Sequence, residues 1–271
     1  MDAQKVFVEF HGRVAVLTLA NPPMNVVTLD LTRQMNAELA RLAANPDVGA
    51  LVLRGSGERA FCAGSDINEF PGLVAESAIV SKKLGFENET YGVVANFPKP
   101  TVAAIEGLAL GGGLELASGC DLIVLSETSR VGLPEILLGG FPGSGGTVRV
   151  TQRIGVGRAK EMMLLGEMID AQTALDWGLA NRIAKAGEVV KTSIELAARM
   201  AQGPAQAAFA CKKALSYAWD LPESEAIRRT LDLSEGLSQT ADFKEGVDAF
   251  LGKRKAQFSD RLDPTVFGFG E

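Results

Sequence analysis

T-V-A-A-I-E-G-L-A-L-G-G-G-L-E-L, running from Thr101 to Leu116, is the stretch that decides the fold. The apolar run that follows Pro100 is typical of a buried strand. Glu106 and Gly107 then predict a turn, and glycines 111–113 lead into an apolar segment that predicts the start of a helix. The stretch therefore predicts a buried strand that turns into a helix.

The three glycines permit two interpretations. Backbone without Cβ atoms lets another molecule approach its N–H groups, which would also be the unpaired donors of the helix's first turn. Glu115 would then be a carboxylate in apolar surroundings beside an anion hole, which makes it a candidate general acid or base. Alternatively, the glycines serve only a tight crossing of helix and sheet, and Glu115 is an ordinary first-turn acid. The stretch alone favours neither.

Composition restricts the class of protein. A chain of 271 residues, 46% hydrophobic, suits one large domain or a main domain with an appendage. The net charge of −6 argues against nucleic-acid binding, because no basic run occurs before Lys253–Lys255. The apolar stretches are too short to span a membrane, and the N-terminus M-D-A-Q-K-V has no signal-peptide core. We expect a cytoplasmic protein with no nucleic-acid or membrane partner.

Several familiar catalytic devices lack the residues that they require. The single histidine, His11, lies between two strand-like runs and is expected in a turn. A Ser-His-Asp or Cys-His catalytic site therefore has almost no candidate histidine. Cys62, Cys120 and Cys211 lack metal-ligand spacing and are expected to be reduced core residues. Neither G-x-x-x-x-G-K-[ST] nor G-x-G-x-x-G occurs. Any chemistry must therefore depend on carboxylates, backbone dipoles and hydroxyls.

The front half of the chain repeats a strand–turn–helix pattern. Residues 6–19 predict a hairpin around His11-Gly12, and Thr28 is expected to cap a helix that continues to Ala44. Further strand-like runs begin at Ala50, Thr101 and Asp121. The repeat predicts a largely parallel sheet with helices packed outside it, which is an α/β arrangement.

Two more stretches add to the candidate site. Ala60–Ile67 (A-F-C-A-G-S-D-I) is a second place where small residues leave the backbone accessible. In Val131–Gly139 (V-G-L-P-E-I-L-L-G), Pro134 predicts a helix start and puts Glu135 in its first turn. Glu135 is either a second functional carboxylate in apolar surroundings or simply an acid that favours a helix N-terminus.

Together these motifs resemble the crotonase (enoyl-CoA hydratase/isomerase) family. They occur in the family's order and spacing over nearly the whole chain. Each motif alone is moderately specific for the family, and the set together is strongly specific. The matching stretches are Ala60–Ile67, Ile105–Leu116, Leu133–Gly139, Pro142–Thr147, Ala174–Ile183 and Ala249–Phe258.

The resemblance implies an α/β fold, a crotonase-like spiral of ββα repeats with a helical C-terminal trimerisation segment. The spiral core with its CoA-thioester site would occupy residues 1–200, and the helical oligomerisation segment residues 201–271. The expected partners are an acyl-CoA thioester substrate and further copies of the chain, as a homotrimer or a dimer of trimers. The family's chemistry needs no metal or redox cofactor, and coenzyme A enters as part of the substrate.

The resemblance also implies the reaction, which is hydration of 2-enoyl-CoA to 3-hydroxyacyl-CoA by a lyase. The family's two oxyanion-hole donors fall on the backbone N–H groups of Ser65 and Gly112, and its two catalytic glutamates on Glu115 and Glu135. Isomerase members commonly keep only the second acid, whereas this chain has both. Many relatives have alanine in place of Ser65. Either the Ser65 hydroxyl touches the substrate, or only the backbone N–H of this residue has a role.

Substrate or CoA contacts carried over from the family fall on Ala63, Asp66, Ile67, Gly111, Phe250 and Lys253. Asp66 is also expected to cap the helix turn that follows it. Phe250 and Lys253 would reach the site of a neighbouring subunit, where Lys253 would lie near the phosphates of CoA. Alternatively, Lys253 belongs to a solvated helix end.

Two alternatives to hydration stay open. The acyl pocket falls in the poorly matched residues 73–96, so an isomerase or another crotonase-type reaction is the nearer one. A non-catalytic CoA-ester-binding scaffold is the other, although binding alone does not require both Glu115 and Glu135. The sequence leaves open the acyl group, the pathway, the choice of trimer or hexamer, and which glutamate is mainly the acid.

Overall fold

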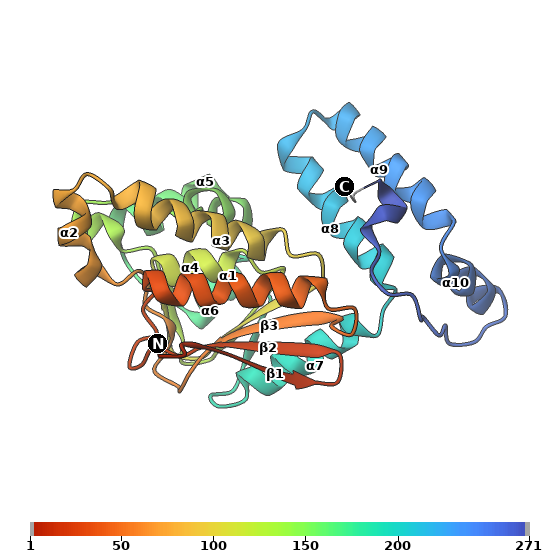
Figure 1. The fold of residues 1–271 in the computed structure, drawn as a ribbon, viewed down its shortest axis with the longest axis horizontal. Helices are drawn as coiled ribbons and strands as arrows, with labels where there is room; N and C mark the ends of the chain where they lie inside the picture. The colour runs from red at the N-terminus through yellow and green to blue at the C-terminus, as the bar shows by residue number, and fades with distance from the viewer. Residues whose placement is uncertain (1–2, 269–271) are drawn as a thin grey trace.

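The computed structural model describes residues 3–268, which form two β-sheets, a set of helices packed on them and a helical C-terminal arm (Figure 1). The strands are β1 (Val6–His11), β2 (Val14–Leu19), β3 (Ala50–Gly55), β4 (Ala60–Cys62), β5 (Thr101–Ile105), β6 (Leu108–Leu110), β7 (Leu122–Ser126), β8 (Arg130–Gly132), β9 (Ile169–Asp170) and β10 (Arg182–Ala184). The α-helices are α1 (Leu29–Ala44), α2 (Phe70–Ala75), α3 (Gly85–Ala95), α4 (Gly112–Ser118), α5 (Gly146–Leu165), α6 (Ala171–Asp176), α7 (Val189–Ala201), α8 (Ala205–Asp220), α9 (Glu223–Ser238) and α10 (Ala241–Leu251). Shorter helical turns are η1 (Ile67–Glu69), η2 (Val80–Leu84), η3 (Glu135–Leu138) and η4 (Pro264–Phe267).

The larger sheet has the strand order β1-β2-β3-β5-β7-β10. Only β1 runs antiparallel to its neighbour, as half of the hairpin expected from the sequence. The remaining pairs are parallel. The cap of α1 is also confirmed, because the Thr28 hydroxyl accepts the N–H of Leu31 at 3.2 Å. The largely parallel sheet with helices outside it is confirmed as well.

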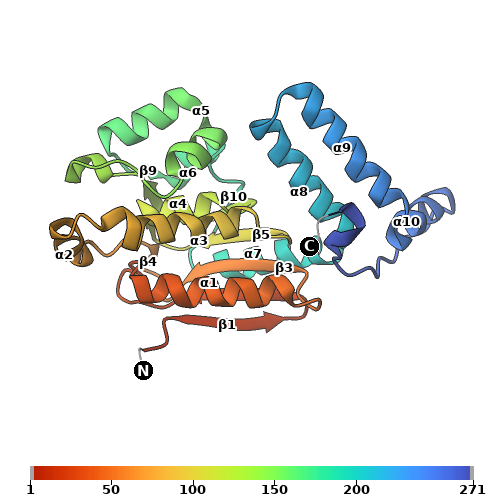
Figure 2. The same ribbon diagram turned by 45° about the horizontal axis from the view of Figure 1, so that its top comes forward.

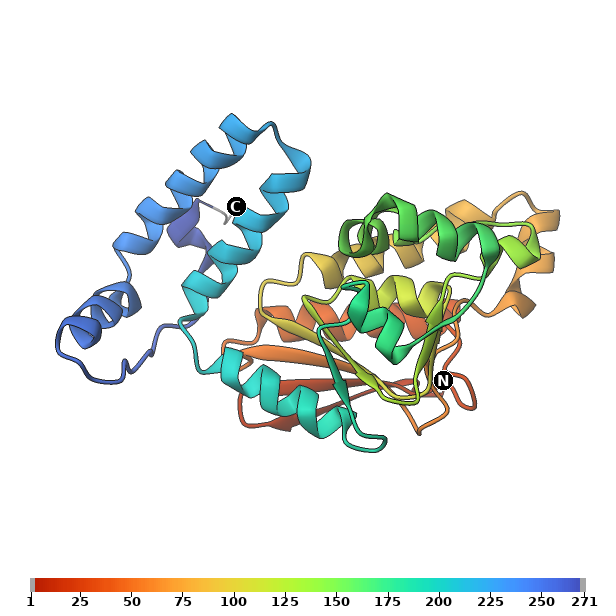
Figure 3. The ribbon, with the colours of Figure 1, turned by 180° about the vertical axis from the view of Figure 1, so that it is seen from behind.

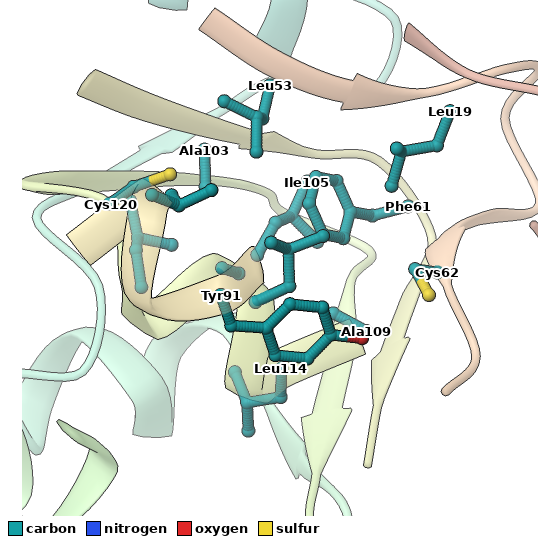
Figure 4. Close-up of a cluster of buried hydrophobic side chains, with 14 of the residues drawn as sticks. Leu19, Leu53, Phe61, Cys62, Tyr91, Ala103, Ile105, Ala109, Leu114 and Cys120 are labelled. Atoms are coloured by element: carbon teal, nitrogen blue, oxygen red, sulfur yellow. The ribbon is translucent and has the colours of Figure 1, made fainter. Parts of the chain in front are cut away.

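The two faces of the larger sheet belong to different apolar cores, because successive side chains of a strand point to opposite faces. Leu53 and Ile105 lie in the core under α1, α3 and α4, shown in Figure 4 around Tyr91 and Leu114. Val52 on the other face packs with residues of α7, the teal helix that lies in front of the sheet in Figure 3. Burial on both faces explains why the strands read as continuous apolar runs.

The smaller sheet, ordered β4-β6-β8-β9, makes the fold a spiral. Each turn contributes one strand to the larger sheet, one to the smaller sheet and then helix. The turns are β3–β4 with α2 and α3, β5–β6 with α4, and β7–β8 with η3 and α5. The expected ββα spiral is therefore confirmed.

The C-terminal arm, α8–α10 with η4, projects from the spiral as a separate group of helices (Figure 2). α7 ends at Ala201 against the larger sheet, and the arm begins four residues later. Lys212 on α8 ties the arm to the spiral, donating from Nζ to Asp121 Oδ2 at 2.6 Å and to the Lys99 carbonyl at 3.1 Å. The helical C-terminal part is confirmed, whereas the domain division into residues 1–200 and 201–271 stays a prediction.

Two sequence-based expectations differ from the structure. The sequence predicted only turns and accessible backbone where the strands of the smaller sheet lie. These strands have two or three residues each, which is too few for an alternating pattern to show. Cys62 and Cys120 are buried as expected, but Cys211 is exposed on α8, so its assignment to the core was wrong. Within residues 3–268, no helix combines the length and apolar character needed to cross a membrane.

Candidate active site

Three strands of the smaller sheet end side by side. β4 pairs in parallel with β6, and β6 with β8, so their carboxyl ends share one edge, where parallel sheets commonly bind ligands. Ala63–Ser65 follows β4, Gly111–Gly112 follows β6, and Leu133–Glu135 follows β8. The Gly111 N–H donates to the Gly132 carbonyl at 3.0 Å and ties two of these segments together. Most of the predicted site is thus assembled by the sheet itself.

The backbone N–H groups of Ser65 and Gly112 lie near each other. A Cβ built on Gly112 would lie 3.5 Å from Ser65 N, and one built on Gly64 would lie 3.4 Å from Gly112 N. The Val27 N–H donates to the Gly64 carbonyl, and the Val27 carbonyl accepts the Asp66 N–H. These two bonds lie on either side of Ser65 and leave its own N–H unused. Neither N–H has a protein acceptor in the described part of the chain. Two unpaired backbone donors near each other make these residues a candidate oxyanion hole.

The three glycines serve different purposes, so both interpretations of the sequence hold in part. Gly111 has φ of 52°, and a Cβ there would lie 3.1 Å from Glu135 Oε1. Gly112 begins α4 and lines the candidate oxyanion hole. A Cβ on Gly113 would instead overlap the Cys62 carbonyl, so this glycine is required by the helix–sheet crossing.

Glu115 is buried on α4, one helical turn after the glycines. Its Oε1 accepts the backbone N–H groups of Ser144 and Gly146, both at 2.8 Å. Burial raises the pKa of Glu115 to about 7; the charge of Glu135 adds to this rise, and the bonds from Gly146 and Ser144 oppose it. A carboxyl group with such a pKa can exchange a proton near neutral pH.

Removing the Glu115 carboxyl is expected to change how stability depends on pH. Its pKa is about 7 in the folded chain against an ordinary value of 4.5, so the folded state binds more protons between these values. Its stabilising contribution is complete below pH 4.5 and is lost as the pH rises through 7. Glu115→Gln keeps an acceptor oxygen and cannot ionise. As the pH rises from 4.5 to 7, the free energy of unfolding of Glu115→Gln should therefore increase relative to that of wild type by roughly 3 kcal/mol.

Urea unfolding at a series of pH values measures this difference. Glu89→Gln, an exposed change on α3, controls for the general effect of removing one negative charge. A gap between Glu115→Gln and wild type that stays constant with pH would contradict the raised pKa.

Glu135 occupies the first turn of η3, as the sequence predicted, with Pro134 as the N-cap residue. Burial raises its pKa above the ordinary value. Its Oε2 is buried and has no hydrogen-bond partner within residues 3–268. Because the charge of Glu135 contributes to the raised pKa of Glu115, the two carboxyl groups are close enough to interact. The structure thus brings both predicted glutamates to the edge where the two donors lie.

The Ser65 side chain has a partner that the sequence did not suggest. Its hydroxyl donates to Glu87 Oε2 at 2.6 Å, so it is not directed at a ligand. Glu87 is fully buried on α3, and burial raises its pKa while the neighbouring Lys83 lowers it. Tyr91, one turn further along α3, has a buried hydroxyl 3.3 Å from the Cβ position of Gly112.

The remaining predicted contacts fall in two places. Asp66 caps η1 as expected, accepting the Asn68 N–H at 3.0 Å, while Ala63 and Ile67 lie on either side of Ser65 and Asp66. Phe250 is 84% exposed near the end of α10, on the arm and away from α4 in Figures 1 and 2. Lys253 follows α10 on the same arm. Neither joins the glutamates within one chain, so their role at a neighbour's site stays a prediction.

Sequence reasoning missed two supports of the site. One is the loop with Ser144 and Gly146, where a Cβ on Gly146 would lie 2.8 Å from Glu115 Cγ. Its signal was the glycine-rich run G-F-P-G-S-G-G at residues 140–146. The other is the pair of Lys83 and Glu87, both fully buried, whose signal was a lysine four residues before a glutamate in an irregular helical segment. Among the described residues, no group of three or more His, Cys, Asp or Glu could hold a metal ion.

Known proteins share both the sequence pattern and the fold. The sequence pattern of the enoyl-CoA hydratase/isomerase family matches residues 9–261. The chain belongs to this family. A probable enoyl-CoA hydratase of Rhizobium meliloti is 39% identical over 262 residues, covering 96% of this chain and 100% of the relative. The mitochondrial enoyl-CoA hydratase of Pongo abelii is 36% identical over 252 residues, covering 93% of this chain and 85% of the relative.

Solved structures confirm the fold of this hydratase/isomerase-family chain. The crystal structure of enoyl-CoA hydratase from Bacillus anthracis matches with a TM-score of 0.89 at 32% identity, covering 94% of this chain and 99% of that one. DspI of Pseudomonas aeruginosa matches with a TM-score of 0.89 at 31% identity, covering 96% and 98%. The expected crotonase fold, including its helical C-terminal part, is therefore shown.

Proposed function

We propose that this protein is a hydro-lyase that adds water to 2-enoyl-CoA thioesters and gives 3-hydroxyacyl-CoA. The observation that carries the proposal is the pair of interacting carboxyl groups with raised pKa, Glu115 and Glu135, beside two unpaired backbone donors. The family and the enoyl-CoA hydratases to which the chain is similar support the same reaction. We assign the catalytic roles to these two glutamates and the oxyanion hole to Ser65 and Gly112.

The oxyanion hole acts on the thioester oxygen. Attack of water at C3 pushes electron density through the double bond onto this oxygen, which becomes enolate-like. N–H groups held toward it stabilise that charge without having to reorganise, and one such donor typically accounts for about 3 kcal/mol. Ser65 and Gly112 follow the ends of two paired strands, β4 and β6, so the sheet holds the segments that carry them side by side.

The glutamates move the protons. One carboxylate accepts a proton from water as the oxygen bonds to C3, and a carboxylic acid delivers a proton to C2, so the elements of water are added across the double bond. Both hydrogen bonds to Glu115 from the described residues fall on Oε1, which keeps the lone pairs of Oε2 for a proton. A pKa of about 7 keeps both the acid and the base form of Glu115 populated near neutral pH, and burial raises the pKa of Glu135 above its ordinary value.

Loss of the conjugated enoyl absorbance of crotonyl-CoA on adding the purified protein tests the proposal. A panel of short, long, branched and aromatic enoyl-CoA esters would then define the acyl group. Migration of the double bond without hydration would favour isomerisation, and tight binding without turnover would favour a scaffold. We further propose that the reaction needs no metal or redox cofactor, which retention of full turnover after treatment with chelator would support.

We also propose that the arm serves assembly, as a trimer or a dimer of trimers. It carries an open apolar groove of about 380 Å³ whose lining includes Leu237, Phe243, Phe250 and Phe258. Exposed apolar side chains of this kind are typical of surfaces that meet another chain. Sedimentation at the mass of three or six chains is the expected result.

Lys253→Ala is expected to raise KM for CoA esters more than it lowers kcat. The neighbouring Arg254 forms a bidentate ion pair with Glu245, whereas Lys253 has no ion pair within residues 3–268. A free cation suits the phosphates of CoA, which an acidic chain otherwise repels. Lys244→Ala, the same charge change on α10, is the matched control. An unchanged KM in Lys253→Ala would assign the lysine to a solvated helix end instead.

A further inference from the structure

A buried carboxylate lies behind one of the two candidate oxyanion-hole donors. Glu87 on α3 is fully buried, and its Oε2 accepts the hydroxyl of Ser65 at 2.6 Å. Its Oε1 lies 2.9 Å from the Nζ of Lys83, which is also fully buried. Oε2 is therefore hydrogen-bonded, whereas Oε1 is ion-paired with Lys83 but has no hydrogen bond from the described residues, and this enclosed position leaves Glu87 poorly placed to exchange a proton with a substrate.

Lys83 connects this pair to the rest of the site. Its Nζ also contacts Glu69 Oε2 at 2.6 Å and donates to the Val27 carbonyl at 2.9 Å. Lys83 lies in η2, a π-helical turn, and such turns are frequent at functional sites. A buried ion pair contributes little net stability, so stability alone does not account for this cluster.

Ser65 is consequently held from two directions. Val27 fixes its backbone through bonds to Gly64 O and Asp66 N, both at 2.8 Å. Glu87 fixes its side chain. The same Val27 carbonyl accepts from Lys83, so the backbone and side-chain anchors belong to one connected network.

We propose that Glu87 is a positioning residue for the oxyanion hole: paired with Lys83, it accepts the Ser65 hydroxyl and thereby fixes the Ser65 N–H toward the thioester oxygen. This inference rests on the proposed function. A fixed donor is effective because a preorganised dipole needs no rearrangement as charge develops. The effect should therefore appear in the chemical step, in kcat, and not in ground-state binding of the CoA group.

Four variants separate positioning from the alternatives. Ser65→Ala and Glu87→Met each remove the hydrogen bond and are expected to lower kcat about ten-fold, the effect of one ordinary hydrogen bond, with KM changed less than about two-fold. Ser65→Ala with Glu87→Met should be no slower than the slower single variant, because one interaction is lost only once. Glu87→Gln should stay within about three-fold of wild type, because its amide can donate to the Ser65 hydroxyl. Glu76→Gln, an exposed acid paired with Lys82, is the matched control.

A direct readout is the carbonyl vibration of a bound, non-reacting acyl-CoA thioester. Ser65→Ala and Glu87→Met should reduce the shift of this band relative to solution by similar amounts, and Glu87→Gln should restore it. Equal losses of kcat in Glu87→Gln and Glu87→Met would overturn the proposal in favour of a charge or proton role. Losses that multiply in the double variant, or a band that neither single variant moves, would overturn it as well.

Failure of the proposed function gives a different pattern. Wild type would then not hydrate any enoyl-CoA ester, yet the carbonyl band of the bound thioester would still report whether Glu87 and Ser65 act together on the donor. Melting temperatures measured for all variants identify any that do not fold. Should Glu87→Met unfold, the single variants Glu87→Gln and Ser65→Ala still test the proposal.

Discussion

Glu115→Gln and Glu135→Gln are each expected to lower kcat for crotonyl-CoA hydration by a factor on the order of 10² to 10⁴, the range for a positioned acid or base. Glutamine keeps the shape of the side chain, and at position 115 it keeps an acceptor for Ser144 and Gly146. Thioester affinity should therefore stay within a few-fold of wild type. Steady-state kinetics together with calorimetric binding of an unreactive acyl-CoA measure both quantities.

The double variant adds a sharper test. If the two glutamates act on one water, loss of either disables the same step, and Glu115→Gln with Glu135→Gln should be little slower than the slower single variant. Glu89→Gln, exposed on α3, serves as the control and should retain the turnover of wild type. Near-normal kcat in either single variant would remove that residue from the mechanism.

Gly112→Ala is expected to give a folded protein with kcat lowered on the order of 10² to 10³-fold, as when an oxyanion-hole hydrogen bond is lost, because its methyl group obstructs the hole while its N–H is kept. Gly112 has no positive φ, so alanine suits its backbone. The new methyl group would lie 3.5 Å from Ser65 N and 3.3 Å from the Tyr91 hydroxyl, so it would crowd the space beside the Ser65 N–H. Activity assays and thermal unfolding of the same preparation separate the two effects.

Two other glycines provide the comparison. Gly157 on α5 has no neighbour within 4 Å of an added Cβ, so Gly157→Ala should keep both activity and stability. Gly113→Ala should instead lose stability, because its Cβ would overlap the Cys62 carbonyl. A Gly112→Ala protein with wild-type turnover would show that the oxyanion does not bind between Ser65 and Gly112.

The sequence was most informative where local chemistry and the fold agree. Pro134 predicted the turn that presents Glu135, and the glycines before Glu115 predicted both the helix start and the accessible backbone. The spiral of ββα repeats followed from the family resemblance, because strands as short as β6 and β8 carry no periodicity of their own.

What the sequence did not predict depends on contacts between distant residues. The bond from Ser65 to Glu87 joins positions 22 apart, and the bonds from Ser144 and Gly146 to Glu115 join positions about 30 apart. No spacing rule within one helix or strand relates such pairs. The same holds for Cys211, whose exposure is set by where the arm leaves the spiral and not by its apolar neighbours in sequence.

Turnover of crotonyl-CoA in ¹⁸O-labelled water, followed by mass spectrometry of the CoA products, tests the central claim most directly. The two glutamates and the oxyanion hole together predict 3-hydroxybutyryl-CoA carrying a single ¹⁸O atom, formed by wild type and nearly absent with Glu115→Gln. A rearranged enoyl-CoA without label, or free coenzyme A with the label in the released acid, would contradict hydration as the reaction of this site.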